Sequence, residues 1–462
     1  MPSVTRRQFL GALSAGAAAW ALRPGLLAAA EPVKKPNFVI LFTDDQGYGD
    51  LGCFGSPNIK TPNLDRMAAE GMKFTDFYAQ PICTPSRAAL MTGCYPQRVG
   101  YGNGVENVKS STGLNLDEIT VAEVLKPAGY ATGMVGKWHL GDAPKFQPIH
   151  QGFDSYFGVP YANNMKPLYY IRGDQRADDP LDQATLTQTF TRHAIDFITK
   201  NKDRPFFLYL AYCAPHGPLV PNAAFKGKSA GGAYGDVVEE VDASAGQILD
   251  TLKKLGLDNT TLVFFTSDNG PWLTLGKDGG SAGPLRGGKG SAWEGGSRVP
   301  GIFRWPGHIP SGRTCSAITA TIDILPTFAK LAGAQTPTDR ILDGRDISPL
   351  IFGQSTDSPR EYFFYFGFSS VVHAVRSGPW KLVVRDPAAP YGRKDNKPGD
   401  NWNRPPERTP LLTTPQLYNL HDDLGEATDV ASQHSDIVKK LQSAIDRFAG
   451  DLEKTNRPRG HL

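Results

Sequence analysis

The sequence predicts an α/β fold: a large, mostly parallel β-sheet flanked by helices on both faces, followed by a smaller C-terminal α+β subdomain of antiparallel strands and one helix. Two observations predict it. Apolar runs of strand length alternate with helical segments over most of the chain, which is the pattern of a parallel sheet with helical crossovers. After the stretch 353–359, short strands joined by tight turns replace this alternation. We therefore expect folded domains at 31–355 and 356–462, and 462 residues with 40% hydrophobic content can bury a large core.

The elements of the main sheet follow from local signals. The run 37–43 is continuously apolar, as in a strand buried on both faces. Thr61-Pro62 supplies a cap and a first-turn proline for one helix, and Thr120 with Glu123 forms a capping box for another. The expected strands are 37–43, 72–78, 130–135, 206–212, 261–266 and 301–305, and the expected helices are 61–71, 120–129, 185–200, 234–255 and 322–331.

The C-terminal subdomain is expected to contain three strands and one helix. Short apolar runs with turns between them, such as Ser377-Gly378-Pro379, are typical of antiparallel strands. The segment 385–415 is rich in Pro, Arg, Asn and Asp and is expected to be a loop. The expected strands are 362–368, 371–376 and 380–384, and the expected helix is 435–452.

The first thirty residues resemble a targeting segment. Residues 5–10 read Thr-Arg-Arg-Gln-Phe-Leu, a twin-arginine signature, and an apolar run then ends in three alanines at 28–30. A membrane anchor is the alternative, but Arg23 and Pro24 interrupt the run. We expect cleavage after Ala30, transport by the twin-arginine export machinery, a periplasmic or secreted protein, and no stable membrane span in the mature chain.

The balance of acidic and basic residues argues against binding to polyanions through overall charge. Three of the 49 basic residues lie in the first thirty positions, which contain no acidic residue, so 46 basic residues face 46 acidic ones in the remainder. A chain without net charge has no overall attraction for nucleic acid or for an anionic membrane surface. We expect no nucleic-acid partner.

Polar side chains follow four of the predicted strands at the point where each strand ends. Because the carboxyl ends of parallel strands meet at one edge of a sheet, these side chains are expected to lie together, where open α/β sheets place their ligands. Each has an ordinary explanation as a turn, surface or core residue, but their recurrence at successive strand ends favours a site. Two adjacent aspartates there also favour a bound cation. These residues are Asp44, Asp45, Lys137, His139, His216, Asp268 and Asn269.

Cys83 is expected at the N-terminal end of a helix. Pro85 suits the first helical position, Thr84 would then be the N-cap, and Arg87 is about one turn further on. The helix end and the guanidinium would together attract an anion, and a thiolate nucleophile at Cys83 remains open on this reasoning. Five cysteines without a C-x-x-C pair argue against a zinc site or a disulfide scaffold. The others are expected to be buried apolar residues: Cys53, Cys94, Cys213 and Cys315.

The segment 268–298 is rich in glycine. Neither the Walker spacing nor a G-x-G-x-x-G following a strand is present. The glycines are therefore expected to let the backbone approach a small ligand closely, with Lys289 as a point charge.

Two motifs carry a resemblance to a known family. Residues 83–87 read Cys-Thr-Pro-Ser-Arg and are followed by Met-Thr-Gly at 91–93, and residues 136–141 read Gly-Lys-Trp-His-Leu-Gly. Together they resemble the signature of the type I sulfatases of the alkaline phosphatase superfamily, and the arylsulfatase A-like branch in particular. The strand-end residues and Lys289 stand in the family's order, so the resemblance covers nearly all of the mature chain. It implies an alkaline phosphatase-like fold and a sulfuric ester hydrolase.

The resemblance implies two non-protein components. Cys83 would be converted to formylglycine by a formylglycine-generating enzyme, and the hydrate of this aldehyde would supply the nucleophilic hydroxyl. One Ca²⁺ ion would be held by oxygen ligands, the kind that calcium prefers. The implied ligands are Asp44, Asp45, Asp268, Asn269 and the oxygen on residue 83.

The resemblance also implies roles for the remaining polar residues. Arg87 and Lys137 would hold the hydrate, and Lys289 would bind the sulfate with help from Lys137 and His216. Asp268 would take a proton from the attacking hydroxyl. His216 would be the general acid for the leaving oxygen, and His139 would deprotonate the second hydroxyl so that the aldehyde is regenerated.

One position departs from the family pattern. Ala162 stands where the branch usually has a pocket serine, and Asn163 is the candidate to replace its hydrogen bond. His373 in the C-terminal subdomain is a weaker candidate for the pocket rim, since a structural histidine beside a strand is about as common.

Other functions remain open on the sequence. Relatives use the same aldehyde and metal on phosphorus, so a phosphonate or phosphate monoester hydrolase is one alternative, and a non-catalytic carbohydrate-binding protein is another. The loops 161–182 and 385–415 mix aromatic, amide and cationic side chains suited to sugars. We therefore expect a small-molecule or oligosaccharide sulfate ester as substrate, with a sulfated carbohydrate favoured.

Overall fold

The computed structural model describes residues 35–102, 105–367, 369–388 and 411–462, and residues 36–462 form one compact unit. The predicted signal segment 1–30 and its cleavage site lie outside the described residues. Across the described ranges, no helix combines the length and the apolar character needed to cross a bilayer.

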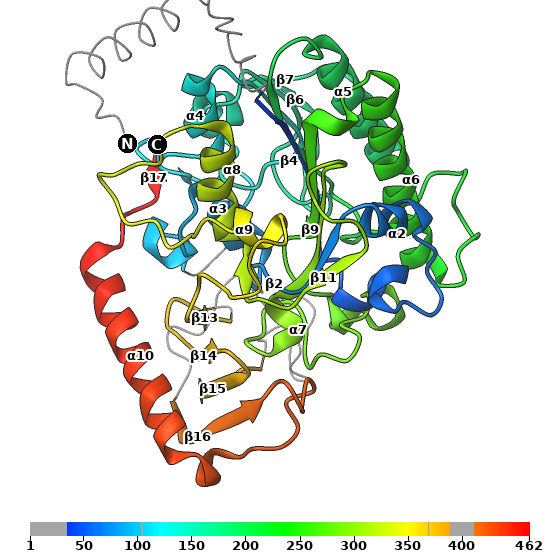
Figure 1. The fold of residues 1–462 in the computed structure, drawn as a ribbon. Coiled ribbons are helices and arrows are strands. Elements are labelled where there is room, and N and C mark those ends of the chain that lie inside the picture. Colours follow the sequence, from blue (N-terminus) through cyan, green and yellow to red (C-terminus); the bar gives the residue numbers. More distant parts are fainter. Residues whose placement is uncertain (1–34, 103–104, 368, 389–410) are drawn as a thin grey trace, which may run out of the picture. The chain divides into compact units, whose positions relative to one another are not determined.

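The main sheet is large and mixed, with a parallel centre. It has 11 strands, and its central neighbours β9, β1, β8, β4 and β5 all run parallel (Figure 1). β10 is antiparallel to both β9 and β2. The strands in order of adjacency are β11 (Arg313–Cys315), β2 (Met72–Tyr78), β10 (Arg298–Arg304), β9 (Thr261–Ser267), β1 (Asn37–Thr43), β8 (Phe206–Ala211), β4 (Ala131–Lys137), β5 (Ser155–Val159), β6 (Ile171–Arg172) and β7 (Gln175–Arg176), with β12 (Thr319–Ala320) beside β2.

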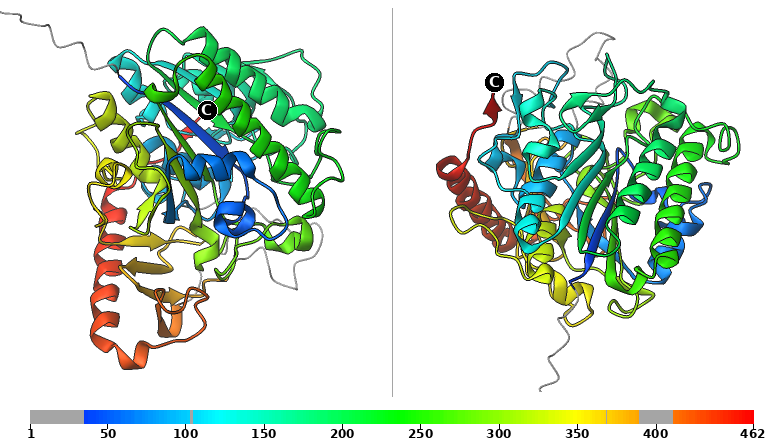
Figure 2. Two further views of the ribbon diagram at one scale, coloured as in Figure 1. Left: turned by 45° about the vertical axis from the view of Figure 1, so that its right-hand side comes forward. Right: turned by 90° about the horizontal axis from the view of Figure 1, so that it is seen from above.

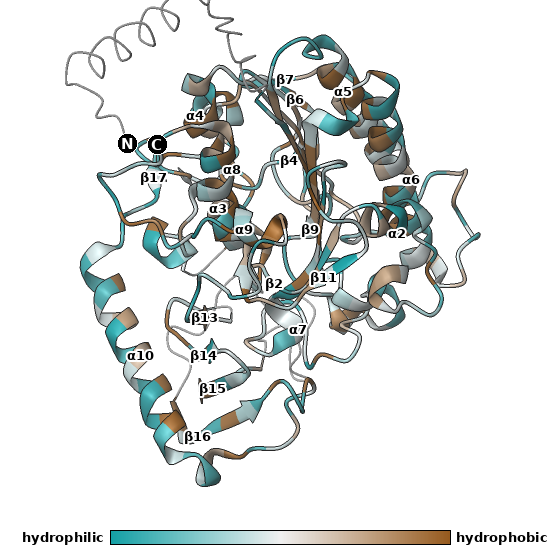
Figure 3. Ribbon diagram, viewed as in Figure 1, coloured by the Kyte–Doolittle hydropathy of each residue, from teal (hydrophilic) through white to brown (hydrophobic). Residues whose placement is uncertain are grey.

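Helices cover both faces of this sheet, as Figure 2 shows from two further sides. Separate apolar cores lie between the sheet and the helices on each face. Figure 3 shows the brown apolar strands between helices whose outer faces are teal. The predicted α/β architecture is confirmed. One face carries α2 (Pro62–Ala69), α5 (Leu186–Lys200) and α6 (Gly232–Lys254); the other carries α3 (Cys83–Thr92), α4 (Val121–Leu125), α8 (Ile324–Ala332) and α9 (Ser348–Ile351).

The C-terminal subdomain is a four-stranded antiparallel sheet with α10 (Ser435–Thr455) packed on it. The antiparallel strands and the single helix agree with the prediction, and the boundary at residue 355 stays a prediction. A short pair of strands, β3 (Thr112–Gly113) and β17 (Gly460–His461), joins the end of the chain to the main domain. The sheet strands are β13 (Phe363–Tyr365), β14 (Ala374–Ser377), β15 (Trp380–Arg385) and β16 (Leu411–Asn419).

The predicted loop 385–415 is wrong at its end, because β16 begins at Leu411. Pro415 argued against a strand, since proline has no N–H for the ladder. β16 is the edge strand of its sheet, and a register shift interrupts its pairing with β15. An edge strand tolerates proline because one side of its backbone has no partner strand in this sheet.

Candidate active site

The four strand ends singled out by the sequence lie side by side. β9, β1, β8 and β4 are consecutive neighbours in the parallel centre, so their carboxyl ends share one edge. Hydrogen bonds extend the strand pairing past the strand ends, from Asp44 N to Ala214 O and from Asp268 N to Thr43 O, both at 3.0 Å. The edge thus brings together all seven strand-end residues predicted from the sequence.

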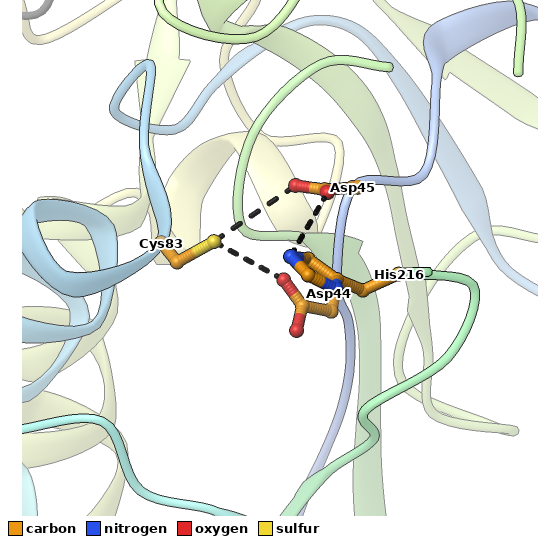
Figure 4. Close-up of side chains that lie close together, drawn as sticks. All are labelled: Asp44, Asp45, Cys83 and His216. Atoms are coloured by element: carbon orange, nitrogen blue, oxygen red, sulfur yellow. Dashed lines mark hydrogen bonds and ion pairs between the residues drawn. The ribbon is translucent and has the colours of Figure 1, made fainter. Parts of the chain in front are cut away.

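Cys83 faces this edge from the first turn of α3 (Figure 4). Its Sγ lies 3.3 Å from Asp44 Oδ1 and 3.9 Å from Asp45 Oδ1. Burial raises the pKa of the Cys83 thiol well above its ordinary value, and the Asp268 and Asp44 carboxylates add to this. The surroundings therefore disfavour a thiolate, so the alternative of a thiolate nucleophile loses its support.

The predicted cap of this helix is wrong by two residues. α3 begins at Cys83 with Ile82 at the N-cap, and the Thr84 hydroxyl accepts a hydrogen bond from Glu106 N at 3.3 Å. Thr84 lies inside the helix because the tertiary contact with Glu106 takes the hydroxyl that would have capped it. Cys83 is nonetheless at the helix N-terminus, as predicted.

Each of three buried carboxylates at this edge is paired with a cation. Lys289 Nζ is 2.8 Å from the Asp45 carboxylate and Arg87 Nη2 is 2.9 Å from Asp268 Oδ2. Lys137 Nζ is 2.5 Å from Asp44 Oδ2, and Arg87 also donates to Lys137 O at 3.1 Å. Three negative charges thus meet three positive ones in a site from which water is largely excluded.

These neighbours give two of the carboxyl groups opposite titration behaviour. Burial alone would raise the pKa of Asp44, but the charges of Lys137, His216 and Arg87 outweigh it and lower the pKa well below its ordinary value. Burial raises the pKa of Asp268 to about 7, and the negative charge of Asp44 adds to this. Two neighbouring carboxyls with different proton affinities are a common feature of catalytic sites.

Asn269 has a buried acceptor that fits a metal ion. Its Nδ2 donates to Asp45 Oδ1 at 2.8 Å and to Gly270 O at 2.9 Å, while its Oδ1 accepts no hydrogen bond from the described residues. Ligand atoms of Asp44, Asp45, Cys83 and His216 lie within 4.8 Å of one another. Carboxylate and amide oxygens are the donors that Ca²⁺ prefers, so these residues fit the implied ion.

His216 lies against the metal cluster. Its Nε2 is 3.6 Å from Asp45 Oδ2 (Figure 4). Its Nδ1 is 2.6 Å from Gly217 O, which fixes the ring. Burial lowers the pKa of His216 to about 4, against the opposing effect of Asp45. The sequence predicted a proton donor here. With this pKa the ring is neutral at pH 7 and its one N–H donates to Gly217 O, so Nε2, which faces Asp45, has to take up a proton before it can donate one.

His139 is buried, and neither ring nitrogen has a hydrogen-bond partner among the described residues. Burial lowers the pKa of His139 well below its ordinary value, and Lys137 and Arg87 contribute in the same direction. A neutral imidazole with unoccupied nitrogens suits proton transfer to or from a bound group. Its φ of 60° and the φ of 65° at Asp45 are left-handed conformations, which are strained for residues other than glycine and cluster at functional sites.

The other three positions named from the sequence are not part of the cluster formed by Asp44, Asp45, Cys83 and His216. Asn163 Nδ2 is 3.4 Å from His216 O, so it contacts the backbone of the histidine. Ala162 is buried and its methyl group makes no hydrogen bond. The His373 Nδ1 forms its 3.0 Å hydrogen bond with Asp386 O, within the C-terminal subdomain.

Sequence reasoning missed Trp272. Its ring lies 5.2 Å from the His216 ring, centroid to centroid, and Lys289 Nζ is 4.5 Å from its ring centroid. The signal was its position just after Asp268-Asn269-Gly270-Pro271, because a residue that follows a ligand-bearing strand end lines the same edge.

Three family models match the chain, and one of them, the C-terminal model of N-sulphoglucosamine sulphohydrolase, covers residues 289–384. Residues 36–334 match the model described as Sulfatase, and residues 358–459 match the C-terminal region of aryl-sulfatase. Arylsulfatase A of Bos taurus is 38% identical, with 93% of this chain and 90% of that protein covered. N-acetylgalactosamine-6-sulfatase of Mus musculus is 43% identical, with 94% and 89% covered.

Solved structures agree with this assignment. The PsFucS1 sulfatase from Pseudoalteromonas sp. superposes with a TM-score of 0.83 at 28% identity, covering 94% of each chain. Ps i-CgsB, solved in complex with k-i-k-neocarrahexaose, has a TM-score of 0.75 at 30% identity and covers 92% of this chain and 94% of its own. The matched models span more than half of the chain and the relatives nearly all of it, so the chain belongs to the sulfatase family of sulfuric ester hydrolases, with arylsulfatase A-like relatives.

Proposed function

We propose that this protein hydrolyses a sulfate ester to an alcohol and inorganic sulfate, using formylglycine made from Cys83 and one calcium ion. The observation that carries the proposal is the position of Cys83: buried, 3.3 Å from Asp44 Oδ1, and surrounded by paired carboxylates and cations. The hydrate of formylglycine would supply the nucleophilic hydroxyl, and the ion, held by the carboxylates, would supply positive charge.

The charge balance of the site supports an anionic substrate. Asp44, Asp45 and Asp268 are offset by Arg87, Lys137 and Lys289, so the protein alone contributes no net charge there. A divalent ion leaves a positive excess in a low-dielectric site, where it stabilises negative charge on sulfate oxygens far better than in water. The proposed ligands are Asp44, Asp45, Asp268, Asn269 and residue 83. Asp44, Asp45 and Cys83 lie in the observed cluster and Asn269 Oδ1 is free of hydrogen bonds from the described residues, while Asp268 is proposed from the family resemblance.

The residues around this centre bind the ester and move protons. Arg87 and Lys137 orient residue 83, and Lys289 holds sulfate oxygens. His216 donates the proton to the leaving oxygen and Asp268 accepts one from the attacking hydroxyl. His139 accepts the second proton, which its unpartnered nitrogens allow.

A sulfated carbohydrate is the substrate class we propose. The name of the mouse relative refers to a sulfated amino sugar, and the solved Ps i-CgsB complex contains an oligosaccharide. Export through the twin-arginine signature at 5–10 would bring the enzyme into contact with such polymers outside the cytoplasm.

Mass spectrometry of the peptide that carries Cys83 tests the proposal. The protein is made in cells that contain a formylglycine-generating enzyme, and the expected peptide has exchanged sulfur and two hydrogens for one oxygen. Cys83→Ala is expected to lose hydrolysis of every sulfate ester. An unmodified thiol in a protein that hydrolyses sulfate esters would contradict the proposed nucleophile.

Substrate panels separate the proposed function from its alternatives. Rates are compared for an aryl sulfate, monosaccharide O-sulfates, a phosphate monoester and a phosphonate monoester. We expect the sulfates to be preferred. A preference for either phosphorus ester would favour the monoester hydrolase, and binding of sugar without any hydrolysis would favour the non-catalytic protein.

Removal of the metal is expected to abolish activity without unfolding the chain. The carboxylates keep their cationic partners when the ion is absent, so its removal leaves no uncompensated charge in the fold. The measurement is activity after dialysis against a calcium chelator, then after adding Ca²⁺ back, with circular dichroism as the control. Full activity in chelator-treated, metal-free protein would exclude a metal role.

A further inference from the structure

A cavity of about 620 Å³ opens beside the active site. Its walls come from three loops that also carry functional residues: one follows β5, one follows His216, and one follows Asn269. The lining residues from these loops are Asn163, Asn164, Lys166, Gly217, Pro218, Leu219, Trp272, Leu275 and Asp278, and Ala233 of α6 completes the lining. The volume is within the range of small-ligand pockets.

Trp272 connects the cavity to the catalytic residues. Its ring lies against the His216 ring, at 5.2 Å between centroids, and against the Lys289 ammonium, at 4.5 Å from Nζ to the ring centroid. His216 is the proposed proton donor to the leaving oxygen, and Lys289 the proposed sulfate ligand. A ring that carries the sulfate therefore has to lie next to Trp272 when its ester oxygen is in place.

The wall of the cavity on this side is apolar. Seven large hydrophobic side chains are exposed in the described part of the chain, and three of them lie in these loops: Val220, Leu273 and Leu275. Leu275 is 39% exposed and faces the loop at Gly217. A Cβ added to Gly217 would lie 3.7 Å from Leu275 Cδ1. A concentration of exposed apolar groups at the mouth of a catalytic site is typical of a surface that binds a ligand.

The opposite wall offers a buried hydrogen-bond acceptor. Asn163 is 5% exposed, and its Oδ1 accepts no hydrogen bond from the described residues. Its Nδ2 is engaged with backbone oxygens of His216 and Pro218 at 3.4 and 3.5 Å, which sets the direction of the amide. A buried acceptor without a donor is costly, so a ligand hydroxyl that donates to it gains more than it would at the surface.

We propose that this cavity binds the leaving group of the substrate as a single pyranose ring, whose C–H face packs on Trp272 and whose hydroxyl donates to Asn163 Oδ1. The inference rests on the proposed function and adds the residues that select the substrate. An apolar platform opposite an amide acceptor matches the two faces of a sugar. An aryl ring shares the stacking and lacks the hydroxyl, so Asn163 distinguishes the two ligands.

The first test compares variants on two substrates. Trp272→Ala is expected to raise KM about tenfold or more for both a monosaccharide O-sulfate and an aryl sulfate, and Trp272→Phe to recover most of the loss. Asn163→Ala is expected to lower kcat/KM for the sugar sulfate by about 5- to 50-fold and to lower it less for the aryl sulfate, which loses only the support that Asn163 gives to the backbone of His216. Equal losses on both substrates in Asn163→Ala would overturn its role as a hydroxyl acceptor.

Exposed positions provide a test that does not depend on the folding of a Trp272 variant. Leu275→Asp places a charge on the apolar wall and is expected to raise KM for both substrates, while Leu116→Asp, at 46% exposure and away from the cavity, is the matched control. Trp380→Ala is the control for losing a tryptophan elsewhere. Unchanged KM in Leu275→Asp would overturn the assignment of the cavity.

Binding of the desulfated product separates this inference from the proposed function. Calorimetric titration of the Cys83→Ala protein with the desulfated monosaccharide needs no hydrolysis. If the desulfated sugar binds and Trp272→Ala weakens that binding, the subsite is supported. This holds even if the wild type hydrolyses no sulfate ester, because the absence of hydrolysis would contradict only the proposed function. Hydrolysis of sugar sulfates with no effect of Trp272→Ala on binding or KM would overturn the subsite alone.

Discussion

His139 combines a strained backbone with an unpartnered side chain. Its φ of 60° is left-handed, and both ring nitrogens are buried without a hydrogen bond from the described residues. Neither feature stabilises the folded chain, since one stores strain and the other leaves polar groups unpaired. Both are expected where a side chain is held ready to contact a bound group.

Replacing His139 with asparagine is expected to reduce kcat by about 10²–10⁴-fold and to change the melting temperature little. Asparagine tolerates left-handed backbone better than alanine does, so the turn is preserved while the proton acceptor is lost. The measurement is steady-state kinetics beside thermal unfolding. A variant with wild-type kcat would remove His139 from the mechanism.

Glu240 in α6 makes stability depend on pH. Burial raises the pKa of its carboxyl from 4.5 to about 7, and a hydrogen bond from Asn222 N opposes this only in part. Between pH 4.5 and pH 7 the carboxyl of Glu240 keeps its proton in the folded state and releases it in the unfolded chain. The stabilising contribution of the protonated carboxyl is therefore complete below pH 4.5 and is lost as the pH rises through 7.

Glu240→Gln is expected to remove that pH dependence. The amide stays neutral at every pH, so urea unfolding should show the variant gaining stability relative to the wild type between pH 5 and pH 8. A hydrogen bond gained or lost by the amide itself does not depend on pH, so it would change the stability equally at pH 5 and pH 8. An equal difference at both pH values would show that Glu240 does not titrate in this range.

At the scale of the element, the end of β4 is shaped by a close approach of backbones. Gly136 immediately precedes Lys137 and has a φ of 110°, and a Cβ there would lie 1.8 Å from Ala211 O in β8. Only glycine fits, and the turn it allows carries the chain on to Lys137 and His139. The glycine therefore sets the position of two site residues.

Gly136→Ala is expected to lose both folding stability and activity, far beyond its matched control Gly129→Ala. Gly129 has a similar φ of 90° but nothing within 4 Å of an added Cβ, so only the backbone strain of about 1–2 kcal/mol applies. Urea unfolding and kcat are measured for both. Equal destabilisation of the two variants would mean that β4 and β8 can separate at no cost.

At the scale of the whole molecule, a buried charge network joins the main domain to the C-terminal sheet. Glu294 in α7 (Glu294–Ser297) is fully buried, and its Oε1 is 3.1 Å from Lys381 Nζ of β15. Tyr78 of β2 and Tyr365 of β13 each donate to the same carboxylate at 2.6 Å. Burial alone would raise the pKa of Glu294, but Lys381, Arg376 and Arg298 outweigh it and lower the pKa.

Glu294→Gln is expected to destabilise the protein by about 3–5 kcal/mol, because it leaves buried cations unpaired. The exposed pair of Asp250 with Arg66 provides the control, and Asp250→Asn is expected to cost about 0–1 kcal/mol. Chemical denaturation gives both values. A loss in Glu294→Gln as small as that of the control would show that the network does not join the two sheets.

The sequence by itself determined the elements and their chemistry. Strands 37–43 and 72–78 were predicted at the bounds that the structure has, since a buried strand needs a continuous or alternating apolar run that local reading detects. The strand-end residues were predicted as one group, because parallel strands leave no other place for their carboxyl ends. Cys83 and Arg87 were singled out by the N-terminal signals of their helix.

Only the tertiary structure decided the contacts between segments far apart in the chain. Thr84 was predicted as a cap but binds Glu106, β16 pairs as an edge strand despite Pro415, and Trp272 meets His216 and Lys289. The pairing of each carboxylate with its cation was also decided there. Local propensity and spacing describe a few neighbouring residues, whereas these contacts depend on which strands lie side by side and on the free energy of burying charge among them.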